Sequence, residues 1–111
     1  MEDVKVVMCR NGHHIISKIN ELYPAQGDSE PICFLLTAPL VITYKTTDDS
    51  ELELSFTLWS PFSKSVEFRI PFDYVVSIGD PKDDILEKYM EIAGPLFERL
   101  ETLNQEEQEE Q

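Results

Sequence analysis

Apolar and polar residues alternate along residues 66–81, VEFRIPFDYVVSIGDP, and the rest of the chain is expected to be organised around this stretch. Phe68 and Ile70 alternate with polar neighbours, and after a one-residue shift at Asp73 the alternation resumes. A period of two predicts β-strands with one face towards water, so two short strands joined at a bend are expected. Pro71 lacks an N–H group and is excluded from a fully paired central strand. The bend is therefore expected at a sheet edge or corner, where another chain could pair.

Residues 4–10 and 13–22 are predicted to form a β-hairpin. Both stretches contain several Val or Ile residues and alternate loosely. Asn11-Gly12 between them is a strong signal for a two-residue type I′ turn, because Asn and Gly both tolerate the positive φ that this turn needs at its two positions. A helix over residues 14–22 is the competing interpretation, and the turn favours the hairpin.

Two further strands are predicted in the middle of the chain. Residues 32–44 form the longest apolar run, which indicates a strand buried on both faces and bent near Pro39. Residues 51–59 show the cleanest alternation. The side chains expected to face inwards there are Leu52, Leu54, Phe56 and Leu58. The segments between these strands are expected to be loops or turns, at residues 24–31, 46–50 and 60–65.

After Gly79 the apolar spacing becomes helical, and a helix is predicted over about residues 81–103. Asp80 is a suitable N-cap and Pro81 fits the first helical position. Gly94-Pro95 is expected to end or kink the helix. Its apolar stripe consists of Ile85, Leu86, Tyr89, Met90, Ala93, Leu96, Phe97, Leu100 and Leu103. Residues 104–111, NQEEQEEQ, have nothing to bury and are expected to form a disordered acidic tail.

The chain of 111 residues is predicted to form one mainly β domain over residues 1–103, with its strands between residues 4 and 79. Short antiparallel strands followed by a single helix favour a small, curved, open barrel. The chain has 22 acidic and 9 basic residues, and its net charge is −13. Because no cluster of Lys and Arg is present, general binding to nucleic acid is disfavoured and DNA is not expected as a partner. A local binding pocket on an acidic body remains open.

The sequence shows no apolar signal segment and no apolar run of twenty residues, so a cytoplasmic protein with free thiols and no membrane contact is expected. The alternatives for Cys9 and Cys33 are a disulfide or, together with His13 and His14, a metal site, although their spacing fits no known ligand pattern. No Ser-His-Asp or Cys-His pairing has supporting context, and the glutamates of residues 51–59 fall on a wet strand face. We therefore expect no enzyme activity, no metal and no cofactor.

The segments VKVVMCRNGHHIISKI and IPFDYVVSIGDP, with a long bent strand between them, resemble the Sm-like (LSm) fold. HIISKINELY, PICFLLT and FRIPFDYVVSIGDP are similar to a group of small Sm-like proteins from marine phages of cyanobacteria, and the resemblance covers about residues 4–100. It implies a strongly bent five-stranded antiparallel sheet, here with the helix after the sheet rather than before it. It also implies that subunits join edge to edge, fourth strand against a neighbour's fifth, into a closed ring of about five to seven copies in the host cytoplasm.

Single residues carry this resemblance only in part. Gly12 stands where the family has its turn glycine, and Ser17 stands where a second small residue lets the strand bend. The RNA-contacting Asp-Xaa-Xaa-Met-Asn is absent, and the comparable region reads LLTAPLVITY. The Arg-Gly of the family's second motif is also missing. Ile70-Pro71 occupies its neighbourhood, and Arg69 lies one residue earlier. These departures count against the usual uridine pocket.

The resemblance implies RNA as a partner, and five residues are candidates for binding it. Arg69 and Lys45 could bind phosphate, and His13, His14 and Tyr23 could stack on bases. Pairing with nearby carboxylates is the alternative for the two cations, and a polar patch on the hairpin is the alternative for the rings.

The candidates for an interface between copies are Phe68, Ile70, Tyr74, Val76 and Trp59. Core packing is the alternative for Trp59. Two functions follow from these partners. The first is an Sm-like ring that binds RNA and acts in RNA metabolism in a phage context. The second is a homo-oligomeric ring that serves as a scaffold for other proteins and binds no RNA.

Overall fold

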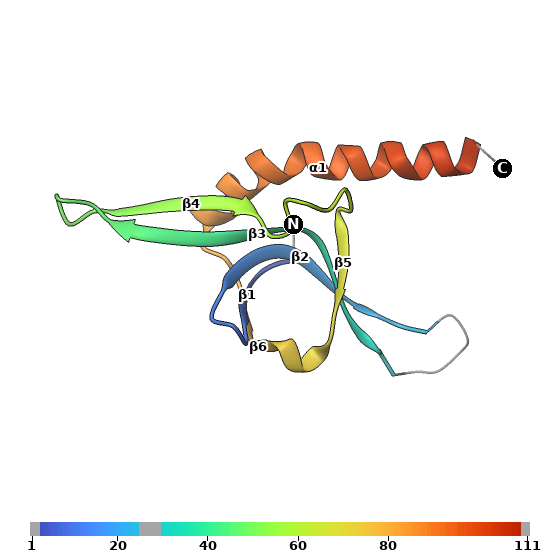
Figure 1. Ribbon diagram of the computed structural model, residues 1–111, viewed down its shortest axis with the longest axis horizontal. Helices are drawn as coiled ribbons and strands as arrows, with labels where there is room; N and C mark the ends of the chain where they lie inside the picture. Colours follow the sequence, from blue (N-terminus) through green and yellow to red (C-terminus); the bar gives the residue numbers. More distant parts are fainter. Residues whose placement is uncertain (1–2, 25–29, 110–111) are drawn as a thin grey trace.

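The computed structural model describes residues 3–24 and 30–109, with side chains described up to Leu100. Within this part, six strands form one antiparallel sheet and a long helix follows them (Figure 1). The elements are β1 (Val4–Cys9), β2 (His14–Leu22), β3 (Cys33–Thr46), β4 (Leu52–Leu58), β5 (Glu67–Ile70), the 3-10 helix η1 (Phe72–Tyr74), β6 (Val75–Gly79) and α1 (Asp83–Glu109). The predicted mainly β architecture with a C-terminal helix is confirmed.

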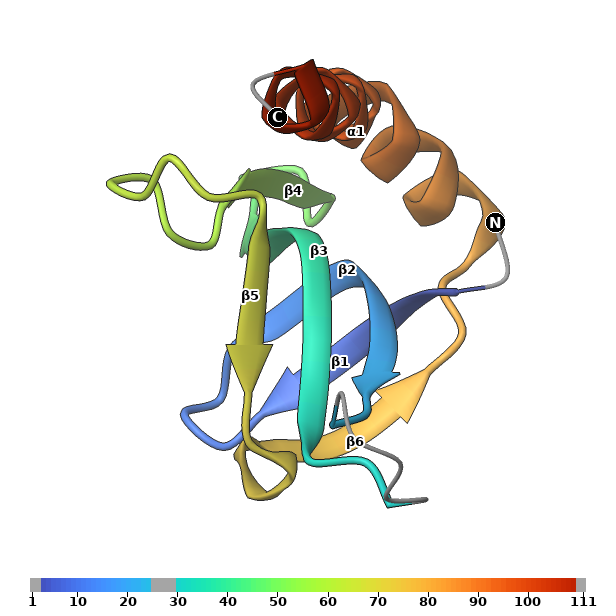
Figure 2. The same cartoon turned by 90° about the vertical axis from the view of Figure 1, so that its right-hand side faces the viewer.

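The long strand β3 is the centre of the sheet. The strands follow the order β4-β3-β2-β1-β6, and β5 also pairs with β3. Because β2 occupies one edge of β3 along its length, β4 and β5 share the other edge, β4 beside residues 40–46 and β5 beside residues 34–37. Figure 2 shows that the sheet is strongly curled and that β5 and β6 lie on opposite sides of the opening. The sheet is therefore bent and open, as the pattern predicts.

The bend of β3 lies at Ala38 and Pro39, where the prediction placed it. Ala38 has a φ of 53°, in the left-handed region, and the register with β2 shifts at the same point. Two residues of β3 there oppose the single residue Ser17 of β2, which is the arrangement of a β-bulge. The Ala38 N–H donates to the carbonyl of Val66, 2.8 Å away, just before β5. The bulge thus separates the part of β3 that pairs with β5 from the part that pairs with β4.

The hydroxyl group of Tyr89 connects α1 to this bend. The Tyr89 side chain is fully buried. Its oxygen lies 2.9 Å from the Ala38 carbonyl and 3.2 Å from the Thr37 carbonyl, and it accepts a hydrogen bond from the Lys18 N–H at 3.3 Å. The Tyr89 hydroxyl thus bonds backbone groups of both strands at the bulge, directing its one hydrogen towards two carbonyls, and the Thr37 carbonyl also accepts from Ser17 Oγ at 3.1 Å.

Two apolar clusters lie on opposite faces of the β1–β2 hairpin, since neighbouring residues of a strand point to opposite faces. Ile16 belongs to the cluster between the sheet and α1, which also contains Val4, Ala38, Leu40, Val66, Tyr89 and Ala93. Ile15 belongs to the cluster inside the curl, with Val7 and Cys9. The curled sheet and its helix therefore bury both faces of the hairpin.

The predicted burial of β3 and β4 holds only for their inner parts. Residues 36–40 are buried without interruption, but Tyr44 is 68% exposed. In β4, Leu52 and Leu58 are 62% and 47% exposed, whereas Phe56 is half-buried against the helix side of the core. The helix begins near this hairpin and runs away from its tip (Figure 1). The prediction that Leu52 and Leu58 face a core is wrong for the single chain. Leu52 lies near the hairpin tip, away from α1, and Leu58 borders a small cavity beside Leu96 of α1 without being buried by it.

The β1–β2 turn differs from the predicted type. Of its residues only Gly12 has a positive φ, at 90°, whereas a type I′ turn needs two. The Gly12 N–H donates to the Cys9 carbonyl and the Cys9 N–H to the His13 carbonyl, both at 2.9 Å, so the loop has three residues. The Asn11 side chain accepts a hydrogen bond from the His13 N–H at 3.0 Å, which holds Asn11 without a left-handed φ. The hairpin is confirmed and the turn type is corrected.

The start of α1 also differs from the prediction. The helix begins at Asp83, two residues after Pro81. The Asp80 carboxylate forms an ion pair with the Lys5 ammonium group of β1. Asp80 therefore ties the end of β6 to the neighbouring strand and does not cap the helix.

Gly94-Pro95 does not end the helix. Pro95 lies inside α1, and Figure 1 shows the first turns inclined to the rest. The helix continues to Glu109, past the predicted end at residue 103, because the Glu, Gln and Leu residues there are good helix formers. Residues 104–109 are thus helical rather than a disordered tail. The Leu103 side chain, residues 110–111 of the predicted tail and residues 25–29 of the predicted loop lie outside the described part.

Replacing Tyr89→Phe tests the connection between helix and bend. The Ala38 and Thr37 carbonyls would lose a partner while staying buried, so the free energy of unfolding should fall by about 1–3 kcal/mol. Urea denaturation followed by circular dichroism measures this. Tyr23→Phe, at a ring that is 51% exposed, is the matched control and should leave the midpoint unchanged. Equal midpoints for wild type and Tyr89→Phe would contradict the role of the hydroxyl.

The same pair of proteins gives a prediction about pH. Burial raises the pKa of Tyr89 to about 12 from its ordinary value of 10, although the hydrogen bond from Lys18 lowers it in part. The folded state then holds the proton more tightly than the unfolded state, so this stabilisation is complete below pH 10 and is lost as the pH rises to 12. The difference in unfolding free energy between wild type and Tyr89→Phe should shrink over that range. A constant difference would count against a buried hydroxyl.

Candidate functional site

The predicted RNA-binding residues lie at separate places in the chain. Lys45 is near the tip of the β3–β4 hairpin, and its ammonium group lies 3.7 Å from the Glu53 carboxylate. Tyr23 follows β2 at the other end of the molecule, and its hydroxyl donates to Glu21 at 2.9 Å. These two ends project in opposite directions in Figure 1. A single chain therefore cannot bring Lys45 and Tyr23 to one ligand.

The two histidines belong to the β1–β2 turn and its exit. The His13 ring nitrogen Nδ1 lies 3.2 Å from the Asn11 amide nitrogen, so it takes part in the turn itself. His14 is exposed at the start of β2 and pairs in register with Ile42 of β3. His14 therefore lies on the same side of the molecule as the base of the β3–β4 hairpin.

Arg69 is exposed on β5, in register with Leu35 of β3. Among the ion pairs found in the described residues, Arg10 meets Asp73 at 3.9 Å, and none includes Arg69. Arg69 is thus a cation available to a partner, but the other candidates do not surround it.

The predicted interface residues divide into buried and exposed ones. Ile70 is only 4% exposed and belongs to the core of its own chain. Phe68 is half-buried and meets Trp59 edge to face, with ring centroids 5.3 Å apart. Tyr74 packs inside the curl, while Val76 of β6 is 64% exposed. The side chain of Ile70 is therefore unavailable to a partner, whereas Val76 is open to one.

The backbone edges of β5 and β6 are free in the described part of the chain. There β5 pairs only with β3, and β6 pairs only with β1. An unpaired edge presents a row of N–H and C=O groups that another strand can bond. In the same part of the chain β4 pairs only with β3, so its outer edge is free as well.

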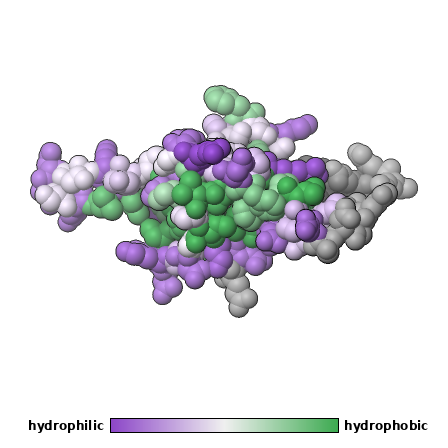
Figure 3. Space-filling model, turned by 90° about the horizontal axis from the view of Figure 1, so that it is seen from below, coloured by the Kyte–Doolittle hydropathy of each residue, from purple (hydrophilic) through white to green (hydrophobic). Residues whose placement is uncertain are grey.

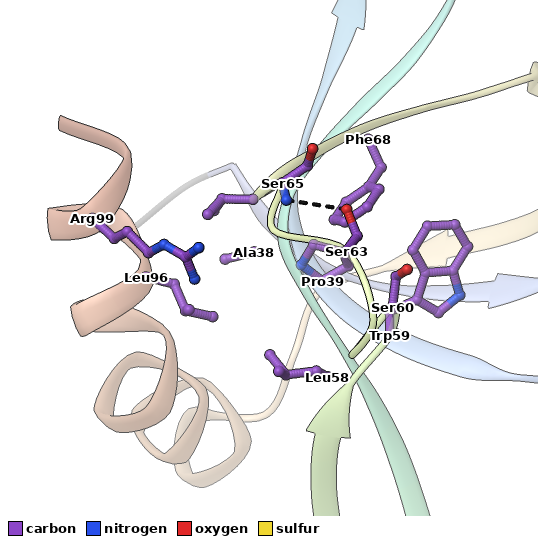
Figure 4. A pocket seen from close by; sticks show the side chains of 11 residues that line it. Ala38, Pro39, Leu58, Trp59, Ser60, Ser63, Ser65, Phe68, Leu96 and Arg99 are labelled. Atoms are coloured by element: carbon purple, nitrogen blue, oxygen red, sulfur yellow. Dashed lines mark hydrogen bonds between the residues drawn. The ribbon is translucent and has the colours of Figure 1, made fainter. Parts of the chain in front are cut away.

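A small cavity of about 40 Å³ lies between β5, the β4–β5 loop and α1 (Figure 4). Trp59, Phe68, Leu96 and Arg99 are among its lining side chains. Arg99 donates from Nη2 to the Lys64 carbonyl at 3.2 Å, which attaches the loop to the helix. The cavity is far too small for a nucleotide base, so we assign it a structural role.

A larger open groove of about 670 Å³ lies between the β3–β4 hairpin and the junction of β6 with α1. Its apolar lining includes Met8, Ile42, Tyr44, Leu52, Leu54 and Ile85. Figure 3 shows the lower face of the molecule, where apolar surface forms a band between hydrophilic rims. Sequence reasoning missed this groove, because alternation in β4 indicated only that these side chains share a face.

The family model that matches this chain covers residues 2–94 and is described as a family of unknown function, DUF6561. The chain belongs to the DUF6561 family. The match includes all six strands and α1 as far as Gly94, so the acidic second part of the helix lies outside it. A comparison of the DUF6561 chain with curated proteins found no match.

The DUF6561 chain has two free thiols, buried Cys9 and half-buried Cys33. Burial raises the pKa of Cys9 above its ordinary value. Among the side chains that the structure describes, in residues 3–24 and 30–100, no group of three or more His, Cys, Asp or Glu could hold a metal ion. No helix in the described part of the chain is long and apolar enough to cross a membrane.

The two thiols should differ in reactivity, because the thiolate is the reactive form and burial disfavours it. We expect Ellman's reagent to modify Cys33 of the native protein first and Cys9 only on the timescale of unfolding. Cys33→Ser should abolish the fast phase, and Cys9→Ser should retain it. Equal rates for the two thiols in native protein would contradict the burial of Cys9.

Proposed function

We propose that the DUF6561 chain is an Sm-like subunit that assembles edge to edge into a homo-oligomeric ring. The observation that carries the proposal is the pair of unpaired strand edges, β5 and β6, on opposite sides of one bent sheet (Figure 2). Two different edges that bond each other form a heterologous contact, which closes into a ring when the rotation between copies allows it. Closure would cover both of these edges in every copy, and the outer edge of β4 would stay outside the contact.

The order of the elements supports this proposal. The resemblance expects a fourth strand that bonds a neighbour's fifth. In this chain two strands, β4 and β5, pair with the same edge of β3 and together correspond to the expected fourth strand. The strand β6, which follows the short helix η1, corresponds to the fifth. In Figure 2, β5 runs downwards and β6 runs to the right with a slight rise, so neighbouring copies must be rotated relative to each other for these strands to pair antiparallel. All pairs within the sheet are antiparallel as well.

For the role of the ring, our first candidate is RNA binding in RNA metabolism, in a phage context. Arg69 lies next to the proposed contact and is repeated once per copy. A ring would therefore gather cations that a single chain keeps apart, and Arg69 is the residue through which we propose phosphate binding.

Our second candidate is a scaffold for other proteins without RNA binding. The net charge of −13 and the pairing of Lys45 with Glu53 favour it, because both lower the attraction for a polyanion. The two candidates share the ring and differ in one property, the affinity for RNA.

Ring formation is tested by the mass in solution. Light scattering coupled to gel filtration should give a multiple of 12.8 kDa for the wild type. Phe68→Glu on β5 and Val76→Glu on β6 should reduce the mass to that of a monomer, because a buried unpaired charge opposes association. Val76 is exposed in the single chain, so its variant should stay folded. Asn20→Glu, on the central strand β2, should leave the mass unchanged. A monomeric wild type would refute the ring.

RNA binding is tested with short U-rich and A-rich RNA in filter binding at two salt concentrations. If Arg69 contacts phosphate, Arg69→Ala should weaken binding about tenfold, as expected for a lost charged hydrogen bond, and reduce its salt dependence. Arg10→Ala removes an equivalent exposed charge at the β1–β2 turn and is the matched control. The absence of binding at low salt would eliminate the RNA role and leave the scaffold.

A further inference from the structure

Phe62 is the most exposed apolar side chain of the described residues. It lies in the loop between β4 and β5 and has no shielding from water. The loop around it is nevertheless held in shape. The Ser63 N–H donates to the Ser60 carbonyl at 3.2 Å, the Ser65 N–H donates to Ser63 Oγ at 3.0 Å (Figure 4), and Arg99 holds the Lys64 carbonyl. A fixed loop that presents a bare phenyl ring to water is typical of a contact residue.

The open groove between the β3–β4 hairpin and the β6–α1 junction has an apolar lining that matches the chemistry of a phenyl ring. Its apolar lining, with Met8, Tyr44 and Leu52, is exposed in the single chain, and its volume of about 670 Å³ leaves ample room for a phenyl side chain. Asp80 and Asp84 stand among the lining residues. Asp80 pairs with Lys5, and Lys82 also lines the groove. Asp84 accepts a hydrogen bond from the Ile85 N–H at 2.9 Å, and none of the ion pairs found in the described residues includes its carboxylate.

The positions of loop and groove match the proposed contact between copies. In Figure 2 the loop projects from the side of β5, and the β6–α1 junction lies on the opposite side. The loop directly precedes the start of β5, and the groove includes Gly79 to Pro81, directly after the end of β6. Antiparallel pairing places the start of one strand beside the end of the other. The loop of one copy would therefore arrive at the groove of the next.

We propose that Phe62 of each copy inserts into this groove of the neighbouring copy, with Lys64 facing Asp84. The occupant is thus a second copy of this chain. The inference rests on the proposed ring and adds a side-chain anchor to its backbone pairing. Such an anchor gives specificity that an exposed strand edge alone lacks, because an edge accepts any strand.

The test measures the concentration at which the oligomer dissociates, by light scattering over a dilution series. Phe62→Ser should raise it at least tenfold, and Leu52→Asp in the groove should do the same. Ile32→Ser removes an exposed apolar side chain far from both sites and should leave it unchanged. Circular dichroism shows whether each variant is folded, so that a loss of assembly is not confused with unfolding.

Cross-linking tests the contact directly. In a Cys33→Ala background, Phe62→Cys combined with Leu52→Cys should give a ladder of disulfide-linked copies on mild oxidation, and neither single variant should give one beyond a dimer. A wild-type ring that tolerates Phe62→Ser and forms no ladder would overturn the inference and leave the ring. A monomeric wild type would remove both. Unchanged assembly with weaker RNA binding in Phe62→Ser would assign the loop to RNA and overturn the inference.

Discussion

The hydrogen bonds of one buried tyrosine are the constraint on which the rest of the structure depends. A strand that bends as β3 does takes backbone groups out of regular pairing, and these groups need partners if they are buried. The Tyr89 hydroxyl supplies them for Ala38, Thr37 and Lys18. Because Tyr89 comes from α1, the helix and the curvature of the sheet depend on each other. The helix is therefore part of the fold rather than an addition to its surface.

The bend in β3 also determines which surfaces remain open. It divides one edge of β3 between β4 and β5, so that β4 continues into a projecting hairpin while β5 leads to η1 and β6. The hairpin keeps apolar side chains on its outer part, where α1 does not reach, and the described sheet leaves one edge each of β4, β5 and β6 unpaired. One local distortion thus accounts for the groove, the free edges and their opposite placement.

The features that the sequence predicts well are those with local causes. Pro39 and Pro71 mark bends because proline cannot donate to a ladder, and the period of two in residues 66–81 identifies β5 and β6. The start of α1 is mispredicted because Asp80 is bound by Lys5, a residue distant in sequence. The exposure of Leu52, near the tip of the β3–β4 hairpin, is mispredicted for a related reason. Alternation shows which face a residue shares, but not how far the covering helix extends.

The candidate sites show the same limit more strongly. Arg69 could be selected as an exposed cation from its place in an alternating strand, and the structure leaves it without an ion pair among the described residues. Its separation from Lys45 and Tyr23 follows from topology, which residue types do not reveal. The sequence does not single out Phe62, because one aromatic residue in a turn that contains Ser and Pro belongs to no helical or strand pattern of apolar positions.

The interruption between β4 and β5 has a consequence for how this family can vary. The register of β4 on β3 is fixed on one side of the bend and that of β5 on the other, so neither depends on the length of the connecting loop. Insertions or deletions in residues 60–65 can therefore be absorbed without sliding a strand. The length of this projection can thus change while the bent sheet beneath it stays the same.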